Sequence, residues 1–145
     1  MFDRVSYVKL INKLVMYGVN VNIIGWVKNY LSDRTSCVRV NGCLSDRFKV
    51  TSGVPQGSVL GPILFVIYVN DMFEVVSGKS VELYLYADSA KLIKNITSNN
   101  DRIVLQSCLD ALNVWCNSWE IKMNVDKCAV MRYGDVLEIG ENNCE

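Results

Sequence analysis

Two segments of this sequence contain residues whose types and spacing could support chemistry. The first, SGVPQGSVLGP at residues 52–62, places glycines on both sides of Pro55 and Gln56, ahead of an apolar run. Glycine lets the backbone approach a ligand closely, and the N–H groups at the start of a helix favour phosphate. Taken alone, such a loop is more often an ordinary turn before a buried helix. A phosphate-bearing ligand and a purely structural turn are therefore the two interpretations.

The second segment is Tyr86-Ala87-Asp88-Ser89, which separates two short apolar runs with strand character. A carboxylate at such a turn could bind a divalent cation, because Mg²⁺ prefers hard oxygen ligands. A single aspartate at a turn is far more often a turn former. Asp88 considered alone therefore favours the structural interpretation.

The composition excludes several kinds of catalytic site. The 145 residues include no histidine and six cysteines, and 15 Lys+Arg balance 15 Asp+Glu. Without histidine there is no Ser-His-Asp or Cys-His nucleophile and no zinc site that depends on imidazole. General acid-base chemistry would have to come from carboxylates, lysine, tyrosine or cysteine. The length suits one ordinary domain with its own core.

The zero net charge conceals an uneven distribution. Residues 1–60 hold eight Lys+Arg and three Asp+Glu, residues 61–120 hold four and seven, and residues 121–145 hold three and five. The basic excess consists of Lys9, Lys13, Lys28, Arg34, Arg39, Arg47 and Lys49. These residues form either an ordinary solvated surface or a surface that faces phosphates, where each contact adds salt-dependent affinity.

Neither the cysteines nor the apolar segments indicate an exported or membrane protein. No two cysteines form a CxxC motif, and charged residues interrupt the first ten positions, unlike a signal peptide. The longest apolar stretch, residues 59–69, is too short to span a hydrocarbon core of about 30 Å. We expect free thiols in an intracellular protein, nuclear or cytoplasmic, that is not secreted and has no membrane partner.

The hydrophobic periodicity in the first half predicts two helices and a hairpin. Apolar residues recur at helical spacing over residues 5–15, where Asp3 is expected as the N-cap and Gly18 as the end, and again over residues 23–31. From Ser36 the period changes to two, and Asn41-Gly42 predicts a tight hairpin turn.

The second half predicts further elements of both types. Residues 58–76 should form a buried helix, and residues 81–86 and 92–96 two strands around a tight turn. A helix should start near residue 100 with Leu105, Leu109, Leu112, Cys116 and Trp119 along one face, and a last strand should cover residues 128–133. The fold class is therefore α+β, with helices on one face of an antiparallel sheet. The acidic tail at residues 135–145 is expected to be disordered.

In their order and spacing, these segments resemble the reverse transcriptase domain of non-LTR retrotransposons of the jockey and chicken-repeat type. The resemblance extends from Phe2 to Gly134. SGVPQGSVLGPILFVIYVNDM is similar to the family's most diagnostic block almost residue for residue. YLSDRTSCVRVNG and LQSCLDALNVWCNSWEIKMNVDKCAVMRYG resemble its flanking blocks. The resemblance implies that residues 1–134 form a polymerase palm-like (ferredoxin-like) antiparallel sheet backed by helices, with a partial fingers region.

The resemblance also implies an activity and its ligands. The family synthesises DNA on an RNA template, using a DNA primer, deoxynucleotides and two Mg²⁺ (or Mn²⁺) ions held by carboxylates. By resemblance, Phe2 screens the sugar 2′-OH, Gln56 contacts the incoming nucleotide, and Gly57 lets the backbone approach it. Asp88 is the first of the paired hairpin aspartates and a metal ligand, and Lys127 is the lysine that assists departure of pyrophosphate.

The basic residues of the region between the second helix and the Gly-Pro loop are the expected nucleic-acid surface, namely Arg34, Arg39 and Lys49. Arg34 resembles the basic residue of the fingers-proximal strand. For Trp115 and Trp119, four positions apart, packing in the core is the better interpretation, both here and in the family.

Two departures from the family pattern bear on activity. The family hairpin reads Ala-Asp-Asp, whereas here Ser89 follows Asp88. The family's principal metal-binding aspartate lies five residues before the aromatic that corresponds to Phe2, whereas this sequence begins at Met1. Removing one neutral oxyanion donor costs about 3–4 kcal/mol, and losing an anionic ligand of two divalent ions should cost more. We therefore expect a catalytically inactive fragment that does not bind its metals productively.

Three interpretations stay open on the sequence alone. The chain is an inactive reverse transcriptase fragment, a noncatalytic RNA or DNA binder, or a fragment that interacts with another protein. In the family a further strand lies beside the segment 81–96, so this hairpin should have an unpaired edge unless a partner or an upstream segment supplies the strand. We therefore expect marginal solubility of the chain by itself.

Overall fold

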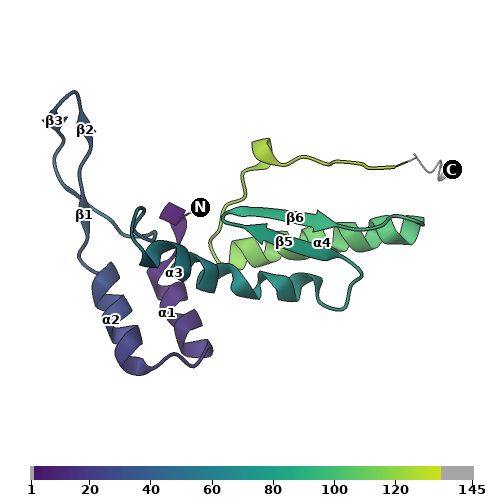
Figure 1. Ribbon diagram of the computed structural model, residues 1–145, viewed down its shortest axis with the longest axis horizontal. Coiled ribbons are helices and arrows are strands. Elements are labelled where there is room, and N and C mark those ends of the chain that lie inside the picture. The colour runs from purple at the N-terminus through teal and green to yellow at the C-terminus, as the bar shows by residue number, and fades with distance from the viewer. Residues whose placement is uncertain (1, 135–145) are drawn as a thin grey trace. The chain divides into compact units, whose positions relative to one another are not determined.

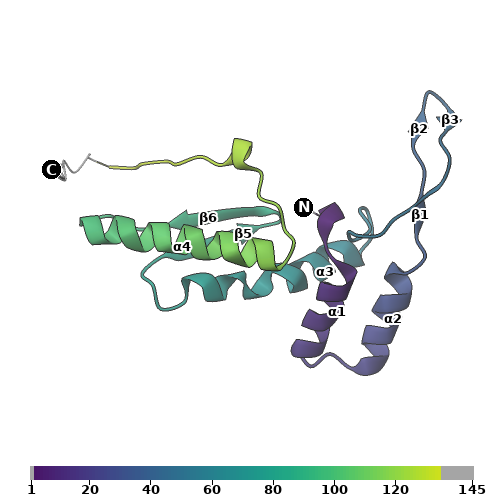
Figure 2. The same ribbon diagram turned by 180° about the vertical axis from the view of Figure 1, so that it is seen from behind.

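The computed structural model describes residues 2–134 of the chain, and these residues belong to two compact units (Figures 1 and 2). Of the described residues, the first unit comprises residues 2–71 together with Ser118–Ile121, and the second comprises Met72–Asn117 and residues 122–134. Helices alternate with short antiparallel strands, which pair as three separate two-stranded sheets. The mixed α+β class expected from the sequence is confirmed. The expected tail at 135–145 lies outside the described residues.

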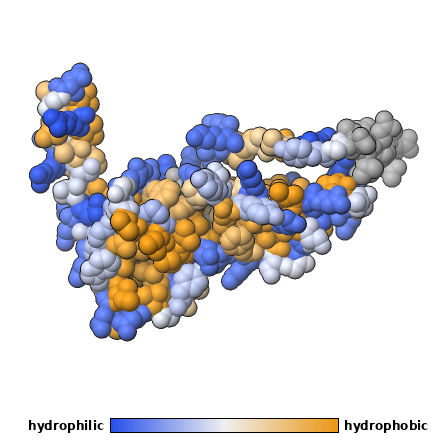
Figure 3. Space-filling view, in the orientation of Figure 1, coloured by the Kyte–Doolittle hydropathy of each residue, from blue (hydrophilic) through white to orange (hydrophobic). Residues whose placement is uncertain are grey.

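Three helices pack together to form the core of the first unit. After the short 3-10 turn η1 (Phe2–Arg4) come α1 (Tyr7–Met16), α2 (Val21–Leu31) and α3 (Leu60–Val69). The apolar residues that they bury are Leu10, Leu14, Val27, Leu31, Leu64, Phe65, Tyr68 and Val69. The predicted apolar stripes of α1 and α2 are therefore buried only in part, because Val8, Val15, Ile23 and Trp26 are exposed, and Figure 3 shows apolar residues on the surface of this unit.

The ends of α1 and α2 differ in part from the expectation. The side chain of Asn20 accepts a hydrogen bond from the backbone N–H of Asn22 at 2.9 Å, which caps α2. The N-cap of α1 is Ser6. The expected cap at Asp3 was wrong, because Asp3 belongs to the preceding turn η1. Gly18 follows α1 with φ +69°, the left-handed conformation that ends a helix.

A narrow ribbon connects α2 to the Gly-Pro loop (Figure 1). Its strands are β1 (Thr35–Ser36), β2 (Arg39–Val40), β3 (Cys43–Leu44) and β4 (Phe48–Lys49). Asn41 and Gly42 both have positive φ, +48° and +84°, so the predicted hairpin turn is confirmed. Ser36 pairs with Phe48 and Arg39 pairs with Leu44. Two residues therefore separate the paired positions on the outgoing side and three on the returning side, and the extra residue forms a bulge.

The second unit consists of a hairpin and one long helix. Its hairpin strands are β5 (Glu82–Tyr86) and β6 (Ser89–Ile93), and α4 (Asn99–Ser118) runs along one face of them (Figures 1 and 2). Leu83 of β5 is buried, as are Cys108, Leu112 and Cys116 of α4. The predicted hairpin and helix are confirmed, although the second strand begins at Ser89 rather than at residue 92. Leu112 and Cys116 of the expected stripe are buried, and Cys108 joins them.

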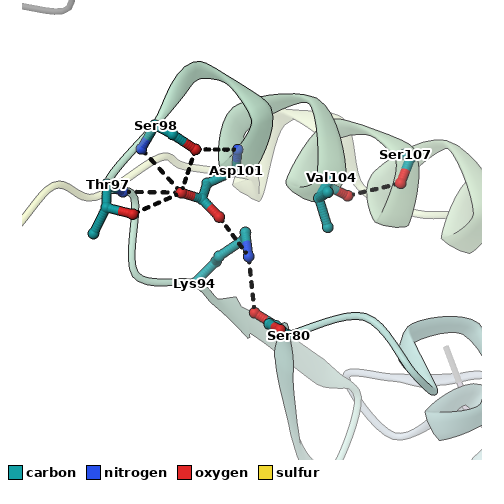
Figure 4. A network of polar contacts seen from close by, with 7 residues as sticks. All are labelled: Ser80, Lys94, Thr97, Ser98, Asp101, Val104 and Ser107. Atoms are coloured by element: carbon teal, nitrogen blue, oxygen red, sulfur yellow. Dashed lines mark hydrogen bonds and ion pairs between the residues drawn. The ribbon is translucent and has the colours of Figure 1, made fainter.

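Polar contacts hold the start of α4 next to the hairpin (Figure 4). The carboxylate of Asp101 accepts hydrogen bonds from the backbone N–H and hydroxyl groups of Thr97 and Ser98, at 2.8 to 3.1 Å. Lys94, just after β6, forms an ion pair with Asp101 at 3.1 Å and donates to the carbonyl of Ser80 at the same distance. The side chain of Asp101 therefore caps α4 and also links it to the hairpin.

Three further expectations need correction. The predicted helix over 58–76 is α-helical only in α3 and continues as the 3-10 segment η2 (Asn70–Val76). Trp119 lies just beyond α4, and Leu109 is 41% exposed, so neither belongs to the buried stripe. Residues 128–133, which follow the 3-10 turn η3 (Val125–Lys127), are exposed. They do not form the expected strand, because they pair with no described strand.

The cysteines of the described part, which are Cys37, Cys43, Cys108, Cys116 and Cys128, are free thiols. Over residues 2–134, no helix is both long enough and apolar enough to cross a membrane.

Candidate nucleotide pocket and catalytic hairpin

Hydrogen bonds join the N-terminal segment of the first unit to the Gly-Pro loop. The backbone N–H of Val54 donates to the carbonyl of Phe2, and that of Gly53 donates to the carbonyl of Val5, both at 2.9 Å. The hydroxyl of Ser52 donates to the carbonyl of Asp3 at 2.8 Å. The loop that carries Gln56 is therefore held beside Phe2, although the two segments are far apart in the sequence.

Two glycines allow this close approach. Gly53 has φ +88°, and a Cβ at this position would lie 2.6 Å from the Cα of Asp3. A Cβ on Gly61, in the first turn of α3, would lie 2.6 Å from the carbonyl oxygen of Pro55. Contacts this short exclude any side chain, so glycine is required at both positions for steric reasons.

Phe2 is fixed by a second contact. Its ring stacks on that of Phe65 in α3, with 4.2 Å between the ring centroids. Phe65 is itself buried in the core of the unit. The aromatic side chain that the sequence singled out is therefore held in place by both the backbone and the core.

A pocket of about 200 Å³ lies between this loop and the base of the ribbon. Its polar lining consists of Asp3, Arg34, Thr35, Ser36, Ser52 and Gln56. The side-chain amide of Gln56 donates from Nε2 to Oδ1 of Asp3 at 3.3 Å. A volume of this size accommodates part of a nucleotide, such as its sugar with a phosphate group, rather than the whole molecule.

Arg34 contributes positive charge to the pocket. Its guanidinium carbon lies 5.7 Å from the centroid of the Tyr30 ring, within the range of a cation–π contact. Burial raises the pKa of Tyr7, and the charge of Arg34 opposes that rise. A pocket with a guanidinium, hydroxyls and an amide suits a polar anionic ligand.

The candidate catalytic hairpin is the turn between β5 and β6. Tyr86 pairs with Ser89, so Ala87 and Asp88 form a two-residue loop, and Ala87 has φ +50°. Alternation along the ladder places Ser89 on the same face as Tyr84 and Tyr86, opposite the face that carries Leu83. Asp88 and Ser89 are both exposed.

The donor atoms at this hairpin do not fit a pair of divalent ions. Within residues 2–134, no three acidic, cysteine or histidine side chains come together in a cluster that could hold a metal. Asp88 offers carboxylate oxygens, whereas the hydroxyl of Ser89 is neutral and binds Mg²⁺ less well. Lys127 lies in η3 of the same unit and is exposed.

The structure places the predicted site residues in two groups. Phe2, Arg34, Gln56 and Gly57 belong to the first unit, in which Arg34 and Gln56 line the same pocket and the ring of Phe2 stacks on Phe65. Asp88 and Lys127 belong to the second unit. Arg39 and Lys49 are exposed on the ribbon.

Two of the basic residues counted in the sequence pair with carboxylates of the protein and are not free to bind phosphates. Lys13 is buried and bonds to the carboxylate of Asp71 and the carbonyl of Tyr68. Lys9 pairs with Glu120 at 2.9 Å and lowers the pKa of that carboxyl. Lys13 lies on the same helical face as Leu10 and Leu14, and this spacing could have indicated its burial.

Comparisons with known proteins agree with the sequence blocks. Residues 1–141 match the family described as "Reverse transcriptase (RNA-dependent DNA polymerase)". The chain is 33% identical over 141 residues to "RNA-directed DNA polymerase from mobile element jockey" of Drosophila melanogaster, covering 92% of this chain and 15% of that protein. It is 35% identical over 132 residues to "Probable RNA-directed DNA polymerase from transposon BS" of the same species, covering 87% of this chain and 14% of that protein.

The similarity extends to other mobile elements. "Probable RNA-directed DNA polymerase from transposon X-element" of Drosophila melanogaster is 32% identical over 130 residues, covering 87% of this chain and 14% of that protein. The chain thus spans about 15% of the length of the relatives that it matches. The resemblance carried by the Gly-Pro block and its flanking segments is confirmed, and the chain belongs to the reverse transcriptase (RNA-dependent DNA polymerase) family.

Proposed function

We propose that this chain is a section of a retrotransposon RNA-directed DNA polymerase that binds a deoxynucleotide and the backbone of template and primer, but transfers nucleotides poorly or not at all. The observation that carries the proposal is the pocket at Gln56. The backbone hydrogen bonds from Gly53 to Val5 and from Val54 to Phe2 join the N-terminal segment to the loop that lines this pocket.

The side chains that line this pocket suit different chemical groups of a nucleotide. Arg34 and the hydroxyls of Thr35 and Ser36 suit the phosphates of a nucleotide, and Gln56 suits a hydroxyl of its sugar. Phe2, fixed on Phe65, would exclude a ribose 2′-OH by steric contact. Gly57, with φ +77° and nothing within 4 Å of a Cβ built there, leaves space beside the loop.

The ribbon is proposed to bind the sugar-phosphate backbone of an RNA template and a DNA primer. Arg39 and Lys49 are exposed on it, and Arg34 lies at its base. Backbone contacts by basic side chains supply affinity that does not depend on the base sequence.

The weak catalysis follows from the hairpin. Metal-dependent phosphoryl transfer with Mg²⁺ or Mn²⁺ needs several carboxylates around the ions, and Ser89 replaces one of them next to Asp88. Asp88 as a metal ligand and Lys127 as the group that assists pyrophosphate departure remain part of the proposal.

A second candidate function, binding to another protein segment, is favoured by the hairpin edges. Within the described residues, β5 and β6 pair only with each other, and a lone two-stranded sheet is marginally stable. Tyr84, Tyr86 and Ile93 are exposed on the face away from Leu83. A partner or an upstream segment that adds a strand would complete a palm-like, ferredoxin-like sheet over residues 1–134, with the ribbon as part of the fingers.

Nucleotide binding tests the pocket. A fluorescent deoxynucleoside triphosphate should bind the 145-residue chain, and Gln56→Ala should weaken that binding about two- to tenfold, the effect of one hydrogen bond. Phe2→Ala should narrow the preference for the deoxynucleotide over the matching ribonucleotide. Equal binding by the wild type and Gln56→Ala would contradict the assignment of the pocket.

Primer extension tests the catalytic part. With an RNA template, a DNA primer and either Mg²⁺ or Mn²⁺, the chain should incorporate no nucleotide above background. Incorporation by the wild type that is lost in Asp88→Asn would show that the hairpin is catalytically competent despite Ser89.

A further inference from the structure

We infer that Asp3 is a positioning residue that fixes the side-chain amide of Gln56 in the pocket. This inference rests on the proposed function, because it assigns Gln56 a ligand. The contact between them joins residues 53 positions apart, and both residues line the same pocket.

The chemistry of the two side chains permits one orientation of the amide. An ionised carboxylate only accepts hydrogen bonds, whereas a glutamine amide has two N–H donors and one carbonyl acceptor. Nε2 of Gln56 lies 3.3 Å from Oδ1 of Asp3. Rotating the amide by 180° would bring its carbonyl oxygen against the carboxylate, which is repulsive. Asp3 therefore keeps Nε2 on its own side and leaves Oε1 as an acceptor.

The backbone of Asp3 is fixed relative to the loop that carries Gln56. Its carbonyl accepts from the hydroxyl of Ser52, and the absence of a side chain at Gly53 lets the two backbones touch. The neighbouring carbonyl of Phe2 accepts from Val54. These contacts fix the two backbone segments relative to each other, so only side-chain rotations must be ordered for the Asp3–Gln56 hydrogen bond to form.

This orientation assigns different parts of a ligand to different residues. An acceptor at Oε1 of Gln56 selects a ligand hydroxyl, such as that on the sugar of a nucleotide. Because the bond to Asp3 uses one of the two N–H donors of the amide, the guanidinium of Arg34 is the main donor for a phosphate. Asp3 would thus favour a hydroxyl-bearing sugar at this position over a group that lacks a donor.

The test compares Asp3→Ala, which removes the acceptor, with Asp3→Asn, which keeps an acceptor oxygen without the charge. Asp3 is exposed and its backbone makes the structural contacts, so neither change leaves a cavity. The first readout is the pair of side-chain amide resonances of Gln56 in a ¹H–¹⁵N NMR spectrum of the 145-residue chain, assigned by their loss in Gln56→Glu. Asp46→Ala, which removes an exposed carboxylate on the ribbon, is the matched control.

We expect Asp3→Ala to shift the Gln56 amide resonances, and Asp3→Asn to leave them closer to the wild-type positions than Asp3→Ala does. The control should not move them. Unchanged Gln56 resonances in Asp3→Ala would overturn the positioning role, whether or not nucleotide binds.

The second readout is binding of the fluorescent deoxynucleoside triphosphate. Asp3→Ala should weaken it about two- to tenfold and Asp3→Asn less. A 3′-deoxy analogue should bind the wild type and Asp3→Ala equally, because it lacks the hydroxyl. Full binding of the normal nucleotide by Asp3→Ala would overturn the inference. Failure of the wild type to bind any nucleotide, together with shifted Gln56 resonances, would instead contradict the proposed function and leave the positioning role supported.

Discussion

The ammonium group of Lys13 is bonded to the carboxylate of Asp71, which links α1 to the segment directly after α3. Lys13 also donates to the carbonyl of Tyr68, and its Nζ lies 3.7 Å from the centroid of the Trp119 ring. The side chain is almost fully buried. Since a buried charge needs a partner, this one lysine holds together three segments of the first unit.

Removing the carboxylate of this pair should strongly destabilise the first unit. Asp71→Ala leaves a buried ammonium without its counter-ion, which typically costs about 3–5 kcal/mol. Urea unfolding, followed by tryptophan fluorescence and by circular dichroism, measures the loss. Lys9→Ala, which breaks the more exposed pair with Glu120, should have a much smaller effect. Equal losses in the two variants would contradict the importance of burial.

The location of Lys13 could not be predicted by counting charged residues in the sequence. Counting basic residues assigned Lys13 to a surface, because its partner Asp71 lies in another helix-forming block. The helices themselves were predictable, since their apolar spacing is local. The spacing of Lys13 with Leu10 and Leu14 could have indicated its burial, but the identity of its partner Asp71 depends on how α1 packs on α3, and no local pattern encodes that.

The close approach at Gly53 predicts a graded effect of two alanine substitutions. Gly53→Ala and Gly57→Ala both place a side chain at positive φ, which costs about 1–2 kcal/mol. Only Gly53→Ala also forces a Cβ against the backbone of Asp3, so it should cost about 1–3 kcal/mol more. Urea unfolding of both variants checks the difference. Matching free energies of unfolding would show that the Asp3 segment is not held against the loop.

The acid sensitivity of the second unit should depend on Asp101. Hydrogen bonds from Ser98, the ion pair with Lys94 and the bonds from Thr97 lower its pKa below the ordinary value of 3.8 (Figure 4). A carboxyl whose pKa is lower in the folded state stabilises it above the unfolded pKa, and this stability is lost as the pH falls through the folded pKa.

Asp101→Asn should therefore reduce the free energy of unfolding at neutral pH and flatten its decline below about pH 4. Urea unfolding between pH 7 and the lowest pH at which the chain stays folded measures this slope. Asp110→Asn on the same helix, where Asp110 accepts from Gln106, is the control and should keep the wild-type slope. The same decline in Asp101→Asn as in the wild type would refute the assignment.

The candidate site was predictable to the extent that it is local. The turn at Asp88 and the loop at Gln56 each follow from Gly, Pro and Asp chemistry over a few residues. The hydrogen bonds that bring Phe2 to that loop join distant positions, and the pairing of Gln56 with Asp3 depends on them. Asp3 therefore had no sequence pattern of its own that indicated a place in the pocket.

The ribbon should contribute a measurable part of the salt dependence of nucleic-acid binding. If Arg39 and Lys49 each contact a phosphate, the double variant Arg39→Ala/Lys49→Ala should reduce the slope of log K against log salt by about 2. Fluorescence anisotropy of a labelled RNA–DNA primer–template at several salt concentrations gives the slope. Lys9→Ala removes one positive charge that is already paired with Glu120 and should leave the slope unchanged. An unaltered slope in the double variant would exclude the ribbon as a phosphate-binding surface.

Restoring a second carboxylate should strengthen metal binding at the hairpin. Ser89 follows Asp88 directly and starts β6, so Ser89→Asp adds an ionised oxygen donor to the same turn. Because divalent ions prefer carboxylate oxygens, Mn²⁺ affinity measured by electron paramagnetic resonance should rise severalfold in this variant. Adding Asp88→Asn to the Ser89→Asp variant should return the Mn²⁺ affinity to the wild-type level. Ser80→Asp, a like-for-like change elsewhere in the second unit, should have no effect. If Ser89→Asp binds Mn²⁺ no better than the wild type, the turn does not orient its side chains toward a common ion, and the hairpin cannot be the metal-binding part of the family site.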